Sequence, residues 1–214
     1  MYNRRGFFSK VGSIFERQGD SVFFGVQFVI NIYGENILRN RLHHVIESGG
    51  SIETPEEKRS YYKRIAALLR EDLPFLEYGF WDYITKKGEA DAEFNDWVTS
   101  ISAMMSTEEE ELGDEIDEMH RLSSDKSYVV ITLLFLLENI DEQAPFFEKI
   151  DEIEEDDYFT KSGFGSLIDA LAYIDFEYSY ADASFIMPGS DEDGVSWEDI
   201  RGEGWEYLKP VMGF

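Results

Sequence analysis

The chain contains no cysteine, only three histidines, and fewer than half as many lysine and arginine residues (19) as aspartate and glutamate residues (45). The lack of cysteine excludes disulfides, thiolate metal sites and thiol nucleophiles together. Any catalytic or metal-binding chemistry therefore has to use oxygen or imidazole ligands. The redox compartment stays undetermined, because disulfides are its usual marker.

Long apolar runs are also lacking. The longest, Val129–Leu137, has less than half of the roughly 20 residues that a membrane-spanning helix needs, and it contains Thr132. The first residues are basic but show neither a long apolar stretch nor a small-residue cleavage site, so they do not resemble a secretion signal. We therefore expect no transmembrane segment and a cytoplasmic protein.

The apolar content is sufficient for a packed core, since apolar residues make up 43% of the chain and aromatic residues 15%. A length of 214 residues fits one domain, which we expect at residues 21–214. Residues 1–20 form a basic amphipathic segment before it. This segment could touch a membrane surface, but docking on its own domain is favoured, because so acidic a body repels anionic lipid.

Negative charge is concentrated after the first third of the chain. Residues 1–70 hold 7 acidic and 11 basic residues, whereas residues 71–214 hold 38 and 8, and the formal net charge is −26. Such a body is repelled by nucleic acid and attracts cations or basic protein surfaces. The expected partner is therefore a protein with a basic surface, with no nucleic acid involved.

Alternating and continuous apolar patterns predict three strands, of which residues 22–33 are covered mainly on one side and residues 128–137 are central. The third, residues 176–187, loses its alternation near Asp182 and predicts a bulge there. Helical spacing predicts the intervening segments as helices: 38–46, 54–70, 73–83, 90–105, 106–122, 145–153, 166–174 and a short one starting at Ser196. The fold class is α+β, a small mixed sheet of about three or more strands layered with several helices, whose strand order cannot be inferred.

Three helix starts carry capping signals. Thr54 is followed by Pro55 and by Glu57 three residues after the cap, a combination that satisfies the unpaired amides of a first helical turn. Ser106 with Glu109 and Ser166 with Asp169 repeat the spacing.

Metal-binding candidates are weak. Asp117 and His120 lie three residues apart, so on a helix both could contact one metal ion, but no second carboxylate–histidine pair accompanies them. An exposed helix face is the favoured alternative. The run 191–194 resembles part of a calcium loop, yet its alignment places Ile200 where a carboxylate is needed. Dense carboxylates at residues 108–111 and 152–157 could collect divalent cations loosely, but solvation is the favoured explanation, and we expect no cofactor.

Two segments could bind an anion. Residues 161–166 carry glycines and serines before a predicted helix, but they lack the lysine–serine ending of a phosphate-binding loop, and their glycines better suit a tight entry to a capped helix. A small positive patch could bind a phosphate or carboxylate, although neutralisation by the protein's own acids is favoured. Its members are Arg39, Arg41, His43 and His44.

Aromatic residues are dense in the run 78–83, and such density often marks an interface. The candidate partner surface consists of Tyr78, Phe80, Trp81 and Tyr83. Core packing is the favoured alternative for the same residues.

The order of several short motifs resembles an uncharacterised family of domains of unknown function, best known from cyanobacteria and plastids. The matching pieces span residues 22–212: Val26 to Ile46, Thr54-Pro55-Glu56, Ala67-Leu68-Leu69-Arg70, Phe80-Trp81-Asp82-Tyr83, Ala92-Glu93-Phe94-Asn95, Tyr128 to Leu134, the strand near Glu177, Ser196-Trp197-Glu198-Asp199 and Leu208-Lys209-Pro210. Each piece alone is unspecific, and their collinearity carries the resemblance. The family implies this fold and supplies no catalytic residues.

No catalytic signature is present, and no nucleophilic triad is indicated by the spacing of serine, histidine and aspartate. The leading hypothesis is a non-enzymatic protein-binding module, in its specific form an inhibitor that covers a basic enzyme. The alternative is a metal-dependent or phosphate-handling enzyme that uses scattered carboxylates and histidines. A third interpretation treats the acidity as an adaptation to high internal salt. A homo-oligomer is compatible with the sequence, which sets no oligomeric state.

Overall fold

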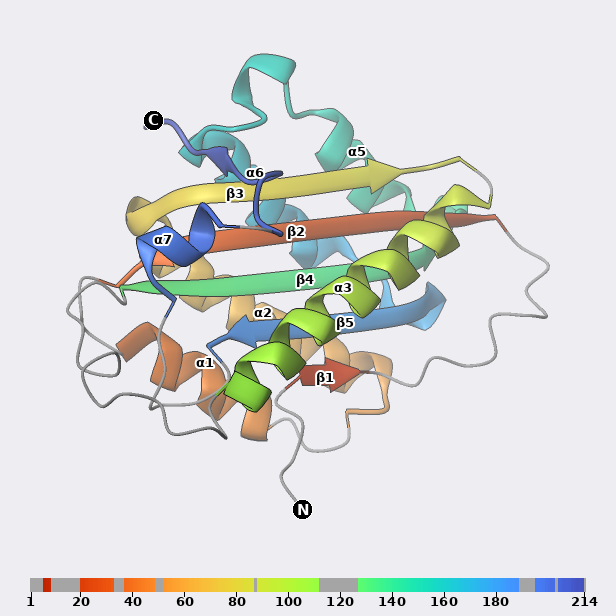
Figure 1. The fold of residues 1–214 in the computed structure, drawn as a ribbon. Coiled ribbons are helices and arrows are strands. Elements are labelled where there is room, and N and C mark those ends of the chain that lie inside the picture. Colours follow the sequence, from red (N-terminus) through yellow and green to blue (C-terminus); the bar gives the residue numbers. More distant parts are fainter. Residues whose placement is uncertain are drawn as a thin grey trace.

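A six-stranded antiparallel sheet forms the middle layer of the computed structural model, which describes residues 6–8, 20–32, 37–48, 52–86, 88–111, 127–188, 195–202 and 204–213. The strand order is β1-β5-β4-β2-β3-β6, and every pairing between these strands is antiparallel (Figure 1). The strands are β1 (Gly6–Phe8), β2 (Ser21–Asn31), β3 (Leu76–Ile84), β4 (Tyr128–Glu138), β5 (Ser179–Met187) and β6 (Lys209–Pro210).

Helices cover both faces of this sheet. In Figure 1, α3 crosses the front face, while α1, α2, α5 and α6 lie behind it. The α-helices are α1 (Ile37–Ser48), α2 (Pro55–Asp72), α3 (Glu89–Glu111), α5 (Ala144–Asp151), α6 (Lys161–Ala170) and α7 (Trp197–Ile200). Short 3-10 helices are η2 (Leu73–Phe75), η3 (Asp141–Gln143), η4 (Glu155–Asp157), η5 (Leu171–Tyr173) and η6 (Phe176–Tyr178).

The α+β class is confirmed, but the expected mixed sheet is wrong, because the strand pairings are antiparallel throughout. The chain leaves β2 and enters β3 at the same end of the sheet, and likewise leaves β4 and enters β5 at one end. Neighbouring strands joined in this way run in opposite directions.

The centre of the sheet is β2 paired with β4 along its full length, from Ser21 opposite Glu138 to Asn31 opposite Tyr128. The expectation that β2 is covered mainly on one side is wrong. Phe24 and Phe28 join the core beneath the helical layer. Phe23 and Val29 are equally buried on the opposite face, which carries α3 and the C-terminal segment around Trp205, Tyr207 and Leu208. Tertiary packing on both faces therefore buries residues that the alternation had assigned to a mixed surface.

A series of hydrogen-bonded polar side chains crosses the buried face of the sheet that carries α3. The fully buried Gln27 donates from Nε2 to Thr132 Oγ1 at 2.9 Å, and its Oε1 accepts a hydrogen bond from the Tyr207 hydroxyl at 2.8 Å. Because both ends of the amide have partners, this polar side chain is tolerated between two central strands. The same contacts attach the C-terminal segment to the sheet.

One of the three predicted capping boxes is confirmed, and the structure adds a second at the predicted helix start Ser196. At α2, Thr54 accepts from the Glu57 amide, and the Glu57 carboxylate accepts from the Thr54 amide at 3.0 Å. Ser196 and Asp199 make the same reciprocal pair at α7. Reciprocal caps of this kind satisfy two amides that otherwise lack a helical partner.

The other two predicted caps are wrong. Helix α3 continues through Ser106 to Glu111, and the remainder of the expected helix 106–122 lies outside the described residues. Helix α6 begins earlier than expected, with Thr160 as its cap, so Ser166 lies inside the helix. Thr160 caps the helix because its side chain accepts from the Gly163 amide at 3.0 Å.

The aromatic segment 73–83 is a further correction, because it is not a helix. Residues 73–75 form η2, and residues 76–84 form β3 between β2 and β6. Gly79 permits this position, because a Cβ atom there would lie 2.4 Å from the Phe164 ring, which packs on the sheet from α6. Pairing with β2 thus decides a segment whose local pattern is ambiguous.

The N-terminal segment is described only at residues 6–8, which form the edge strand β1 instead of the start of an amphipathic helix. Strand β5 begins three residues later than expected, after η6. Its pairing with β4 shifts register between Leu136 and Leu137, opposite Ala181 and Ser179. This irregularity lies close to Asp182, as the lost alternation predicts.

Candidate functional site

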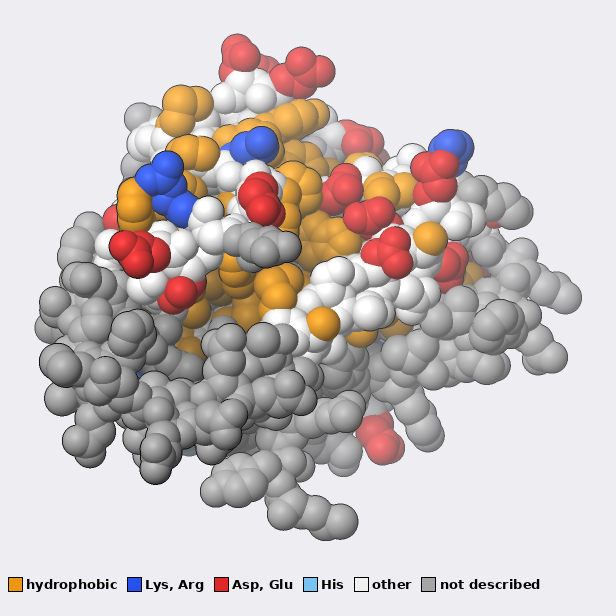
Figure 2. All heavy atoms as spheres, in the orientation of Figure 1, with side chains coloured by type: hydrophobic (Ala, Val, Ile, Leu, Met, Phe, Trp, Pro, Cys, Tyr) orange, Lys and Arg blue, Asp and Glu red, His pale blue; other side chains and the backbone are white. Residues whose placement is uncertain are grey.

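An acidic surface covers residues 141–157, which we call the acidic segment and which comprises η3, α5 and η4. It carries nine exposed carboxylates and one lysine, Lys149. The carboxylates belong to Asp141, Glu142, Glu148, Asp151, Glu152, Glu154, Glu155, Asp156 and Asp157. The segment rises beyond the β3 side of the sheet in Figure 1, and Asp and Glu side chains gather at the same end of the molecule in Figure 2.

Apolar residues on the inner side hold the acidic segment against the core. Phe146, Ile150 and Ile153 are buried and belong to the core beneath the helical layer. Phe146 packs edge-on against Phe24 of β2, with ring centroids 5.3 Å apart. The carboxylates therefore project from the outer side of a packed element, as in any amphipathic surface helix.

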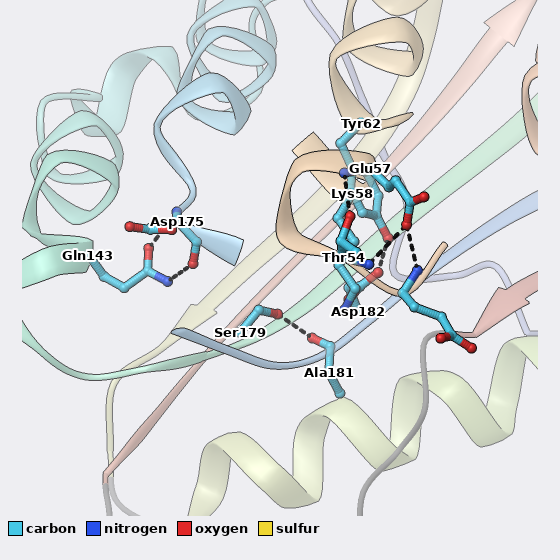
Figure 3. A network of polar contacts seen from close by, with 10 residues as sticks. Thr54, Glu57, Lys58, Tyr62, Gln143, Asp175, Ser179, Ala181 and Asp182 are labelled. Carbon is cyan, nitrogen blue, oxygen red and sulfur yellow. Dashed lines mark hydrogen bonds and ion pairs between the residues drawn. The ribbon is translucent and has the colours of Figure 1, made fainter. Parts of the chain in front are cut away.

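Gln143 anchors the start of the acidic segment, as Figure 3 shows. Its side chain is fully buried and donates from Nε2 to the Asp175 carbonyl at 2.8 Å and to the Tyr178 carbonyl at 3.3 Å. Its Oε1 accepts from the Asp175 amide at 3.1 Å. These bonds connect the segment to the chain that leads into β5, so its position is set by tertiary contacts.

The end of the acidic segment is attached as well. The Trp81 indole on β3 donates to the Tyr158 carbonyl at 3.0 Å, and the two rings lie 5.0 Å apart. Thr160 donates to the Asp157 carbonyl at 3.1 Å before α6 begins. Both ends are thus fixed, and the carboxylates between them form a preorganised surface.

The charge of this surface is little compensated locally. Lys149 forms an ion pair with Glu152 at 2.6 Å, and this hydrogen bond raises the lysine pKa. The negative field also reaches neighbouring phenols. The charge of Glu142 is the main cause that raises the pKa of Tyr178, while burial and then the charge of Asp151 raise the pKa of Tyr83 to about 12.

A second polar cluster lies between α2 and β5, also seen in Figure 3. Lys58 forms an ion pair with Asp182, and the Tyr62 hydroxyl donates to the same carboxylate at 2.9 Å. Tyr61 and Ser184 share a hydrogen bond of 2.6 Å beside them. Burial and then the charge of Asp182 raise the pKa of Tyr62 well above its ordinary value, so the phenol stays protonated and donates.

This α2–β5 cluster is enclosed, since Asp182 is 1% exposed and the Lys58 side chain 12%. Its geometry suits holding α2 on the sheet. The cluster was not predicted, although the sequence holds one signal for it: Asp182 stands between Ala181 and Ala183 in a strand whose neighbours are apolar, and a buried carboxylate requires partners.

The structure separates the four aromatic residues of the predicted partner surface. All are partly buried, but Tyr78 and Phe80 face the α3 side of β3, while Trp81 and Tyr83 face the helical layer. Phe80 stacks on Trp97 and meets the Tyr207 ring edge-on at 5.4 Å. Figure 2 shows apolar side chains between α3 and the C-terminal segment on this face. The four residues therefore do not form one continuous surface.

The predicted positive patch is likewise divided. Arg39 and His43 are buried on the inner side of α1, at 3% and 7% exposure. Arg41 and His44 are exposed, and Arg41 pairs with Glu71 at 2.8 Å. The hydrogen bond to Glu71 raises the Arg41 pKa, as expected for a cation neutralised by the protein's own acid.

The metal candidates Asp117 and His120 and the acidic run 191–194 lie outside the described residues. Within the part of the chain that the structure describes, no group of three or more histidine, aspartate or glutamate side chains could hold a metal ion. Searching the same part shows no helix with the length and apolarity needed to cross a bilayer.

Fold and surface together define an α+β protein, an antiparallel sheet between helical layers with an acidic segment attached at one end. No protein-family model matches the chain, and neither a curated protein nor a solved structure shows a match to it. The resemblance to the cyanobacterial and plastid domain family thus stays a prediction.

Proposed function

We propose that this protein is a non-enzymatic binding module whose acidic segment docks on the basic surface of a protein partner. The observation that carries the proposal is the arrangement of nine exposed carboxylates, with a single lysine among them, on a segment attached at both ends. A partner meets charges already in place, so little conformational entropy is lost on binding.

Charge supports the same proposal over a longer range. A net charge of −26 attracts a basic protein before contact and raises the association rate constant, an effect that salt screens. An inhibitor that covers the active site of a basic enzyme is the specific form that we favour. A cytoplasmic location remains a prediction, and a homo-oligomer remains compatible with the sequence.

The test compares two variants with equal net charge. One neutralises the end of the acidic segment (Glu154→Gln, Glu155→Gln, Asp156→Asn and Asp157→Asn). The matched control neutralises four exposed carboxylates elsewhere (Glu56→Gln, Asp96→Asn, Glu177→Gln and Glu198→Gln). The immobilised wild-type protein captures its partner from cell extract at low salt, and the association rate of the purified partner is then measured by stopped flow.

We expect the acidic-segment variant to lower the association rate constant by about tenfold at low salt and to flatten its salt dependence, because steering acts through charges at the interface. The control should retain most of the wild-type rate. Salt-insensitive association, or an equal loss in both variants, would contradict docking through the acidic segment.

A further inference from the structure

A cavity of about 380 Å³ opens between the C-terminal end of α2, η2 and the outer side of α6. This volume lies within the range of small-molecule sites, about 300 to 1,000 Å³. Two cations line it, Arg70 from α2 and Lys161 from α6. The protein has a net charge of −26, so a cavity lined by two cations differs in charge from most of its surface.

Gly165 makes room for the arginine. A Cβ atom at this position would lie 2.3 Å from Arg70 Nη1, so only glycine lets the guanidinium lie against α6. Arg70 Nη2 donates to Asp169 at 3.0 Å, and the guanidinium carries further N–H groups that can donate to a ligand. Lys161 is held across the cavity by a hydrogen bond from Nζ to the Pro74 carbonyl.

Two hydroxyls stand beside these cations, one turn apart on the exposed side of α6. Ser162 and Ser166 both line the cavity, and Ser166 Oγ lies 3.3 Å from the Ser162 carbonyl, to which it donates. The amides of the first helical turn are used elsewhere: Gly163 donates to Thr160 Oγ1, and Phe164 to the Thr160 carbonyl. Side chains, rather than the helix terminus, therefore provide the donors.

We propose that this cavity binds a phosphate monoester of a small molecule, with the phosphate held by Arg70 and Lys161. A planar guanidinium, an ammonium and the Ser162 hydroxyl match the three terminal oxygens of a phosphate monoester, which accept several charge-assisted hydrogen bonds, while the Ser166 hydroxyl is already used by the Ser162 carbonyl. Leu73 and Pro74 form the apolar wall and receive the organic part. The cavity exceeds the size of a phosphate group, so the ester and not the free ion fills it.

The effect of replacing Asp169 on phosphate affinity has a defined direction. Its carboxylate lines the cavity and competes with an anionic ligand for Arg70. Replacing it by asparagine removes one negative charge and releases the guanidinium. Asp169→Asn should therefore tighten phosphate binding several-fold, whereas loss of either cation weakens it.

The experiment is isothermal titration calorimetry of the full chain with phenyl phosphate, inorganic phosphate and phenol at low salt. We expect phenyl phosphate to bind more tightly than inorganic phosphate, and phenol not to bind. Arg70→Gln and Lys161→Gln should each raise Kd by about tenfold, the effect of losing one charge-assisted hydrogen bond. Arg59→Gln is the matched control, because Arg59 is an exposed cation of the same helix that pairs with Asp175.

A second variant tests geometry without changing charge. Gly165→Ala displaces the Arg70 guanidinium and should also weaken binding, with circular dichroism confirming the fold. Failure of the wild type to bind phenyl phosphate, or equal affinity in Arg70→Gln, overturns the proposal. Equal affinity for inorganic phosphate overturns its small-molecule part. Partner association through the acidic segment is unaffected by these variants, so the two proposals fail separately.

Discussion

At the scale of single residues, Asp182 shows how a charge is accommodated in the core. It is the one carboxylate among the described residues that is buried, and it receives both the ammonium of Lys58 and the hydroxyl of Tyr62. Removing one partner of such a pair leaves the other charge desolvated, which costs more than the pair contributes when intact.

We therefore expect Asp182→Ala to lower the free energy of unfolding by about 3 to 5 kcal/mol, the range for breaking a buried pair. Equilibrium urea unfolding measures this. Asp169→Ala is the control, because its ion pair with Arg70 is half exposed and should contribute less than about 1 kcal/mol. The double variant Lys58→Met with Asp182→Leu should recover most of the lost stability. Equally small losses for Asp182→Ala and Asp169→Ala would count against a stabilising role of the buried pair.

At the scale of elements, Gln143 is the contact that places the acidic segment. The segment's own helix, α5, has only eight residues, which is too short to be stable in isolation. Its position therefore depends on the burial of Phe146 and Ile150 and on the three hydrogen bonds of Gln143 to the backbone of residues 175 and 178.

Gln143→Ala should destabilise this region by about 1 to 3 kcal/mol, the cost of leaving buried backbone groups without partners. Hydrogen–deuterium exchange should show faster exchange at the Asp175 amide and across α5, with little change in β2 and β4. Glu142→Gln, which alters only an exposed neighbour, is the control. Unchanged exchange at Asp175 would show that Gln143 does not hold the segment.

At the scale of the whole molecule, self-repulsion of the net charge opposes the compact state. Salt screens this repulsion, with a Debye length near 10 Å at about 0.1 M. Surface pairs such as Arg41–Glu71 weaken under the same conditions, but their contribution is small. For a protein of charge −26, the relief of repulsion should dominate.

We expect the midpoint of thermal unfolding to rise between about 20 mM and about 300 mM potassium chloride, as the Debye length falls from over 20 Å to below 10 Å. Each kcal/mol gained should raise Tm by about 2 to 4 °C at this chain length. Differential scanning calorimetry measures the change, and sucrose at equal osmolality is the control. A chain that folds only in molar salt would instead favour the salt-adaptation interpretation.

Much of the fold could be predicted because local signals and burial agreed. The capping box at Thr54, the helix at 38–46 and the central strand at 128–137 were each set by residues within one element. Segment 73–83 could not be predicted, because Tyr78 and Trp81 are compatible with both helical and strand spacing, and only pairing with β2 makes the segment a strand. Ser166 is not a cap because α6 already begins at Lys161, where Thr160 caps the Gly163 amide.

The sequence by itself determined the composition of the surface, the layered α+β class and the acidity of residues 152–157, since these follow from residue types and short-range spacing. Only the tertiary structure decided the strand order, the attachment of both ends of the acidic segment and the cavity between Arg70 and Lys161. These features join residues far apart in the chain, and contacts at long sequence separation leave no local pattern to detect.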